Sequence, residues 1–337
     1  MDTWVPSHPM KVRGDRRETF VKMSHIVYRS GLPAIGVGNP LAVYTTTGAR
    51  KTTREEDRIY AIQQIFEARV GTSAPDYKPG LALTLTELEI QLGEKLLQDH
   101  PVLSQMHVFT EPVPAGKRWL VKPSSVVLED VAGWDQATAY PRDTHQSYYR
   151  PWCKLSVRRI GAQAWGHFEG RMCWFTQLQK VCKSWSSELR RESASWESEP
   201  IKMMELEHRH MSQVYRCLKI AVDDAVDVSP RPVYRQDGMR AEDFPPSPDQ
   251  NIYWEALESF PIDELRVLLL GTCFTLHRIV LGILLLPCGG SEFKYYRRIG
   301  ICWWDLSWAN IRAKPLPQYG FLSGEHESWE PQKGLFG

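Results

Sequence analysis

The sequence predicts an α+β fold in which a helical N-terminal part packs on a body with a small, mainly antiparallel sheet. Two observations favour this class. Residues 50–100 carry two capped helical patterns with apolar side chains three and four residues apart, and residues 267–304 carry three short apolar runs punctuated by glycine. A hydrophobic content of 42% and a charged content of 24% are typical of a globular protein, and 337 residues suffice for one or two cores.

The first predicted helix starts near Thr53. The Thr53 hydroxyl suits an N-cap, and Glu56 three residues later completes a capping box. Gly71 is a suitable residue to end the helix. The apolar stripe comprises Ile59, Ile62, Phe66 and Val70. The charged residues Arg54, Asp57 and Arg58 have two interpretations: an ordinary solvated helix start, or an anchor in which the arginines clamp a carboxylate elsewhere.

The second predicted helix follows Thr84, whose hydroxyl can cap it together with Glu87. Its main apolar stripe comprises Leu85, Leu88, Leu92 and Leu96. Ile90 and Leu97 lie well away from that stripe on the helix surface. We therefore expect this helix to pack on two sides.

The middle of the chain is less regular. Residues 121–128 suggest a strand, residues 135–150 an aromatic loop, and residues 153–157 and 172–175 short strands near glycines. A tryptophan series is expected to belong to the core; it comprises Trp165, Trp174, Trp185 and Trp196.

A long helix is predicted over residues 201–222. His210 then lies on its apolar face, while His208 points elsewhere. Residues two apart on a helix do not face each other, so joint metal ligation by this pair is not expected.

The C-terminal part begins with a proline-rich loop at 229–249 and short helices near 252–259 and 263–265. Three apolar runs follow; they are 267–270, 279–286 and 299–304. His277 and Arg278 would lie in the middle of a membrane span here, which favours a buried sheet. Arg297 and Arg298 form either a site for an acidic partner or the polar face of a strand. The tail, 315–337, is expected to be loosely attached.

Composition excludes several classes. The formal net charge is +1, from 41 basic and 40 acidic residues, so nucleic acid and anionic membranes are not expected partners. Seven cysteines without a C-x-x-C pair indicate reduced intracellular thiols. The N-terminus lacks a secretory signal, so a cytoplasmic location is expected. No motif indicates a cofactor, a metal or a catalytic group; residues 36–40 are interpreted as a loop.

Residues 50–62, Arg-Lys-Thr-Thr-Arg-Glu-Glu-Asp-Arg-Ile-Tyr-Ala-Ile, resemble the segment just downstream of the fungal heterokaryon-incompatibility (HET) domain. We call residues 50–66 the signature segment. A second resemblance to the closing region of HET-family proteins lies at residues 268–271, 282–287 and 296–302. The residues that the resemblance marks for family identity or interaction are Thr53, Arg54, Asp57, Arg58, Tyr60, Arg297 and Arg298.

The HET domain itself, to which the family's cell-death activity is attributed, is not visible, and about 45 residues precede the signature segment. The chain therefore resembles the downstream half alone: a truncated gene model, a degenerate paralogue or a standalone protein. The expected division is 1–45, a poorly ordered remnant; 46–228, a helical and mixed region; 229–249, the loop; 250–314, a helix with strands; and 315–337, the tail.

Two functions remain open. The first is a non-enzymatic scaffold or regulatory module in fungal self/nonself recognition, with a protein partner such as an upstream HET domain. The second is a hydrolase-like enzyme whose site is assembled from His145, Asp143 or His167 with a carboxylate. A pocket that gathers these polar residues would favour the enzyme, and scattered positions would favour the scaffold.

Overall fold

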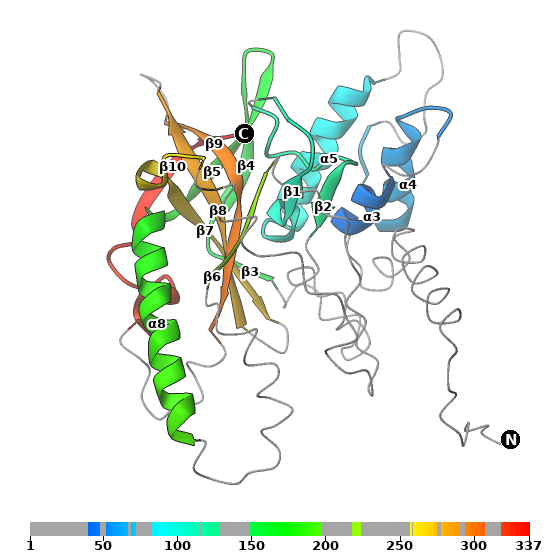
Figure 1. Cartoon of the computed structure of the whole chain (residues 1–337). Helices are drawn as coiled ribbons and strands as arrows, with labels where there is room; N and C mark the ends of the chain where they lie inside the picture. The colour runs from blue at the N-terminus through cyan, green and yellow to red at the C-terminus, as the bar shows by residue number, and fades with distance from the viewer. Residues whose placement is uncertain are drawn as a thin grey trace, which may run out of the picture.

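The computed structural model describes residues 40–47, 52–66, 69–71, 83–114, 116–127, 149–196, 218–223, 257, 259–274, 278–289, 294–306 and 318–337. Both helices and strands are present, as expected for an α+β protein, but the body is mostly sheet (Figure 1). The main sheet has eight strands, so the expectation of a small sheet was wrong.

The elements before residue 130 are α3 (Pro40–Thr46), α4 (Asp57–Phe66), α5 (Leu85–Asp99), the 3-10 turn η2 (Leu103–Gln105), and strands β1 (His107–Phe109) and β2 (Ser125–Val127). The three helices share one apolar cluster, which also receives Val127 from β2. Strands β1 and β2 pair antiparallel as a separate two-stranded sheet.

The strands of the main sheet are β3 (Tyr149–Pro151), β4 (Lys154–Ile160), β5 (Gln163–Trp174), β6 (Leu218–Val222), β7 (Arg266–Phe274), β8 (Arg278–Cys288), β9 (Tyr295–Asp305) and β10 (Glu330–Phe336). Helix α8 (Phe175–Trp196) follows β5 directly, the 3-10 turn η6 (Ile262–Glu264) precedes β7, and the short helix α11 (Tyr319–Leu322) precedes β10.

Five of these strands close into a ring. Strand β7 pairs with β8, β8 with β9, β9 with β10, β10 with β5, and β5 again with β7. Every pairing is antiparallel except that of β9 with β10, in which Leu335 lies opposite Tyr295. Strand β10 therefore closes the ring from the C-terminal end of the chain.

Three strands extend the sheet beyond this ring: β4, which pairs with β5, and two short strands. Strand β3 pairs with β7 at Gly271, and β6 pairs with β9 at Gly300. A Cβ atom at Gly271 would overlap the Arg150 carbonyl oxygen, and one at Gly300 would overlap the Ala221 carbonyl oxygen. Glycine at these two positions lets the neighbouring backbones approach closely enough to pair.

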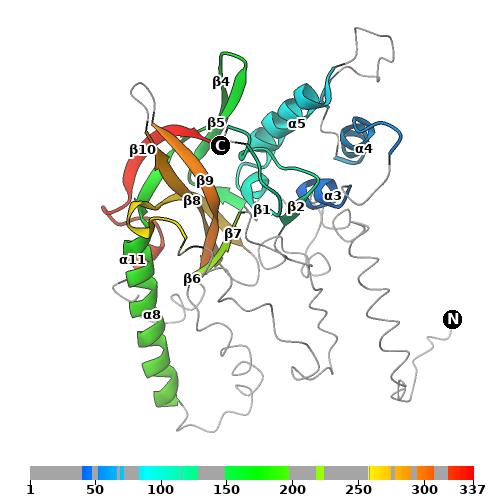
Figure 2. The ribbon, with the colours of Figure 1, turned by 45° about the horizontal axis from the view of Figure 1, so that its top comes forward.

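The main sheet buries both faces. Successive residues of β7 belong to different clusters: Leu268 packs with α5 and Trp119, whereas Leu269 packs with α8 and α11. Figure 2 shows α8 and α11 on one side of the strands and the N-terminal helices on the other. Strands buried on both faces read as continuous apolar runs, which is why 267–270 and 279–286 show no alternation.

Helix α5 agrees closely with its prediction. Thr84 Oγ1 accepts a hydrogen bond from Glu87 N at 3.2 Å, as an N-cap does. The stripe residue Leu92 packs in the N-terminal helical cluster, whereas Leu97 packs in the core of the main sheet. The expectation that this helix packs on two sides is confirmed.

Helix α4 begins later than predicted. Residues before Asp57 form a turn, in which Asp57 N donates to Arg54 O and Arg58 N donates to Glu55 O, both at 3.2 Å. The helix therefore starts at Asp57, four residues after the predicted cap Thr53. Ile59 is buried as the apolar stripe requires.

Several other expectations were wrong. Residues 218–222 form β6 where a helix was predicted, because alternation of Leu218, Ile220 and Val222 fits a strand beside β9. Residues 40–45, assigned to a poorly ordered remnant, all belong to α3, whose Leu41 is fully buried. The tail supplies β10, which ends at the fully buried Phe336.

The predicted tryptophan series contains both buried and exposed side chains. Trp185 is buried in α8, whereas Trp174 is 41% exposed at the end of β5, with the Arg266 guanidinium carbon 3.0 Å from its ring centroid. Helix α8 was not predicted, although Phe175, Leu178 and Cys182 already stand three and four residues apart.

The three C-terminal apolar runs lie in β7, β8 and β9, as the buried-sheet interpretation predicted. Among the helices of the described ranges, none has the length and apolarity needed to cross a membrane. Several predicted features lie outside the described residues: His208 and His210, residues 128–148 with His145 and Asp143, and the loop 229–249.

Candidate functional site

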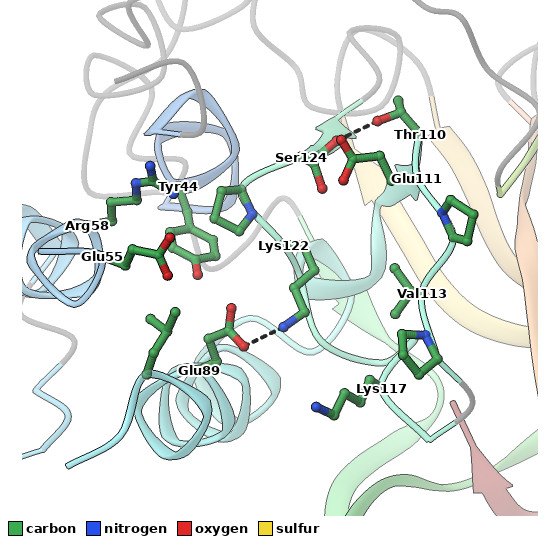
Figure 3. A pocket seen from close by; sticks show the side chains of 14 residues that line it. Tyr44, Glu55, Arg58, Glu89, Thr110, Glu111, Val113, Lys117, Lys122 and Ser124 are labelled. Atoms are coloured by element: carbon green, nitrogen blue, oxygen red, sulfur yellow. Dashed lines mark hydrogen bonds and ion pairs between the residues drawn. The ribbon is translucent and has the colours of Figure 1, made fainter. Parts of the chain in front are cut away.

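A cleft of about 750 Å³ with several charged side chains in its lining lies between α4, α5 and the segment 110–124 (Figure 3). Its volume is within the range of ligand sites in proteins. The described residues that line it are Tyr44, Glu55, Arg58, Leu85, Glu89, Thr110, Glu111, Pro112, Val113, Pro114, Lys117, Lys122, Pro123 and Ser124. This set contains three carboxylates and three cationic groups, so the charges of the lining balance.

The signature segment forms one wall of the cleft. Glu55 and Arg58 stand three residues apart in the turn that opens α4, so their side chains lie on the same side of the chain. The neighbouring Ile59 is buried against α3 and α5, and this packing fixes how the wall faces the cleft.

The floor comes from α3 and α5. Lys122 Nζ forms an ion pair with Glu89 across the middle of the cleft, and both side chains are largely buried. Tyr44 is only 1% exposed. Burial raises the pKa of Tyr44 above its ordinary value, Glu89 raises it further, and Arg58 opposes the rise. The phenol is therefore neutral at physiological pH.

The opposite wall is the rim, residues 110–114, 116 and 117. Thr110 Oγ1 donates to Ser124 O at 2.9 Å, and Lys117 N donates to Pro114 O at 3.1 Å. Glu111 and Lys117 are exposed. Proline lacks an N–H donor and has a fixed φ, so Pro112 and Pro114 restrict the backbone of the rim. The carbonyl group of Val113 accepts from Arg118 Nε and that of Pro114 from Lys117 N, which fixes the course of the rim from within the protein.

A buried arginine anchors the start of this rim to the main sheet. Arg298 of β9 is 0% exposed. Its Nη2 donates to Gln105 O at 3.3 Å and to His107 O, and its Nη1 donates to Arg118 O at 3.1 Å. The guanidinium carbon also lies 5.2 Å from the centre of the Phe109 ring. One side chain therefore holds both ends of the segment that carries the rim.

A second ion pair completes this anchor. Arg118 Nη1 lies 3.6 Å from Asp223 Oδ2, and Arg118 Nε donates to Val113 O at 3.1 Å. Asp223 Oδ1 accepts from Phe109 N at 3.2 Å. Asp223 follows β6, so the rim is attached to β6 as well as to β9. We call Arg298, Arg118, Asp223 and His107 the buried anchor.

His107 belongs to the anchor as a neutral base. Arg298 Nη1 lies 3.1 Å from His107 Nε2. Because arginine only donates, Nε2 must accept, and the ring proton is on Nδ1. Burial, and then the charge of Arg298, lower the pKa of His107 well below its ordinary value.

The seven residues marked by the family resemblance occupy different environments. Arg58 lines the cleft, whereas Thr53 is exposed and Arg54 Nε lies 4.0 Å from a Glu56 carboxylate oxygen. Asp57 begins α4, and Tyr60 is partly buried against the N-terminal helical cluster.

The adjacent arginines Arg297 and Arg298 point to opposite faces of β9. Arg297 is exposed, with its guanidinium carbon 5.9 Å from the Phe260 ring, whereas Arg298 is inside. Only Arg297 is therefore placed to meet an outside partner. The closing motif also contains Gly271 and Gly300, so much of it builds the sheet.

His167 does not lie among the lining residues of the cleft. On the exposed side of the β4–β5 hairpin, its Nδ1 lies 3.1 Å from Ser156 Oγ, and the two residues are directly opposite in the pairing register. A serine hydrogen-bonded to a histidine is the first element of a nucleophilic site. Within the described ranges, no group of three or more His, Cys, Asp or Glu side chains is arranged to hold a metal ion.

Sequence reasoning missed most of the cleft. Glu89 and Lys122 are 33 residues apart, and neither belongs to a recognisable motif. No protein-family model, curated protein or solved structure matches the chain.

Proposed function

We propose that this chain is a non-enzymatic binding and regulatory module of the HET type, which recognises a protein partner through the cleft beside its signature segment. The observation that carries the proposal is the position of Glu55 and Arg58. The stretch with the strongest family resemblance forms a wall of the cleft instead of serving only as a packed helix start.

The electrostatics of the cleft also support binding. Glu89 and Lys122 neutralise each other in a largely buried pair, which suits a fixed floor better than a proton-transfer site. The buried anchor holds the rim to the sheet, so the opposing wall is preorganised. Preorganised walls lower the entropy that a binding site loses when its partner arrives.

The expected partner is a HET domain, in the same polypeptide or in another. The test is to express a HET domain as a separate polypeptide in yeast, with and without this chain, and to measure growth. We expect the chain to change the growth defect caused by the HET domain, and Glu55→Lys to abolish this change. Identical growth with and without the chain would refute the proposal.

A matched control separates the cleft from general charge effects. Lys154 is exposed on β4 and does not line the cleft. Lys154→Glu alters a surface charge by the same amount, two units, as Glu55→Lys, and should leave the growth effect intact.

The hydrogen bond between Ser156 and His167 favours a second candidate function, an esterase-like hydrolase. If this pair is catalytic, the protein should cleave p-nitrophenyl acetate, and both Ser156→Ala and His167→Ala should remove the activity. Hydrolysis no faster than the double variant's background would exclude this candidate.

A further inference from the structure

The charges on the two walls of the cleft bear on the order of acidic and basic side chains in the partner, an inference that rests on the proposed binding function. The α4 wall offers one acid and one base, Glu55 and Arg58, and the rim offers another acid and base, Glu111 and Lys117. Between them the floor is neutralised by the pair of Lys122 with Glu89. Each wall therefore presents both signs of charge.

We infer that the cleft binds an extended polypeptide segment that carries one acidic and one basic side chain on each of its two faces. Successive side chains of an extended segment point to opposite sides, so odd positions meet one wall and even positions the other. Side chains two apart on a strand are separated by roughly 6.5 Å, close to the roughly 5–6 Å between residues three apart on a helical turn such as Glu55 and Arg58.

The rim contributes to the choice of an extended segment. Pro112, Pro114 and Pro123 all line the cleft and supply no N–H groups. They offer ring surface for the aliphatic stems of lysine and glutamate side chains. A compact anion such as phosphate would meet the three carboxylates of the lining as well as its cations, which disfavours it.

This geometry distinguishes two peptides of identical composition. In a repeat of Lys-Lys-Glu-Glu, each face of the extended chain alternates between lysine and glutamate. In a repeat of Lys-Glu, one face carries only lysine and the other only glutamate. The Lys-Lys-Glu-Glu repeat can place a lysine opposite the acid and a glutamate opposite the base of each wall. The Lys-Glu repeat places lysines opposite the base of one wall and glutamates opposite the acid of the other, so like charges meet on both walls.

The experiment is titration of the full chain with the two fluorescently labelled twelve-residue peptides at low salt. We expect the Lys-Lys-Glu-Glu repeat to bind at least tenfold more tightly, and the preference to shrink as ionic strength rises. Lys117→Glu should reduce binding of that repeat at least fivefold, whereas Lys154→Glu should leave it unchanged. Equal binding of the two peptides, no binding, or equal effects of the two variants would overturn the inference.

Failure of this inference can be told apart from failure of the proposed function. If Glu55→Lys abolishes the growth effect of the chain but the peptides bind equally, the cleft is functional and its ligand pattern is wrong. If the chain has no effect on growth but selects the Lys-Lys-Glu-Glu repeat, the ligand pattern stands and the HET-type function does not.

Discussion

The adjacent arginines of β9 provide a quantitative test of the buried anchor. Arg298→Met removes the donor to three backbone carbonyl groups, those of Gln105, His107 and Arg118. Each hydrogen bond from a charged donor contributes about 1.5–3 kcal/mol. Loss of the guanidinium's own desolvation cost offsets part of this sum. We therefore expect the free energy of unfolding to fall by about 3–5 kcal/mol.

The matched control is Arg297→Met on the exposed face of the same strand, for which we expect a change within about 0.5 kcal/mol. Urea unfolding can be followed by tryptophan fluorescence, since the buried Trp303 and Trp304 lie on the same strand. The first variant should shift the midpoint by about 1 M or more, given slopes of roughly 1–3 kcal/mol per M. Equal midpoints for the two variants would refute the anchor.

Three further predictions concern stability. Because the folded state holds His107 unprotonated, the free energy of unfolding should rise with pH below about 6.5, by up to about 1.4 kcal/mol per pH unit. The His107→Gln variant should show a flatter dependence on pH. An unchanged slope in this variant would contradict the neutral state of His107. Gly300→Ala should lower the free energy of unfolding by about 1–3 kcal/mol, because the added methyl group would overlap the backbone of β6. Gly320→Ala should cost little, because the space that its methyl group would occupy is open. Similar melting temperatures for the two variants would contradict this prediction. Removing residues 325–337 should abolish cooperative unfolding, since β10 closes the ring; a cooperative transition in the shortened chain would show that the ring is dispensable.

Local patterns predicted some elements well. Helix α5 was predicted with its cap and both packing faces, since Thr84, Glu87 and the leucine spacing are all read within one helix. The apolar runs of β7 to β9 were assigned to a buried sheet because charge at Arg278 is costly in a membrane.

The errors arose where distant parts of the chain decide the structure. Leu335 and Phe336 look like the end of a loose tail, yet β10 is stabilised by pairing with β5 and β9, whose positions no local pattern reveals. Arg298 reads as a surface charge beside Arg297, and only the carbonyl groups of residues 105–118 explain its burial. The cleft likewise forms only where α3, α4, α5 and the segment that ends at Ser124 come together in the folded protein.

The proposed function requires that the cleft beside the signature segment be the surface that meets the partner. Photocrosslinking tests it most directly, with a benzophenone amino acid in place of Lys117 inside the cleft or Lys154 outside it, each co-expressed with a HET domain. We predict a crosslink to the HET domain from position 117 and none from position 154. A crosslink from position 154 alone, equal crosslinking from both positions, or none from either would contradict this requirement.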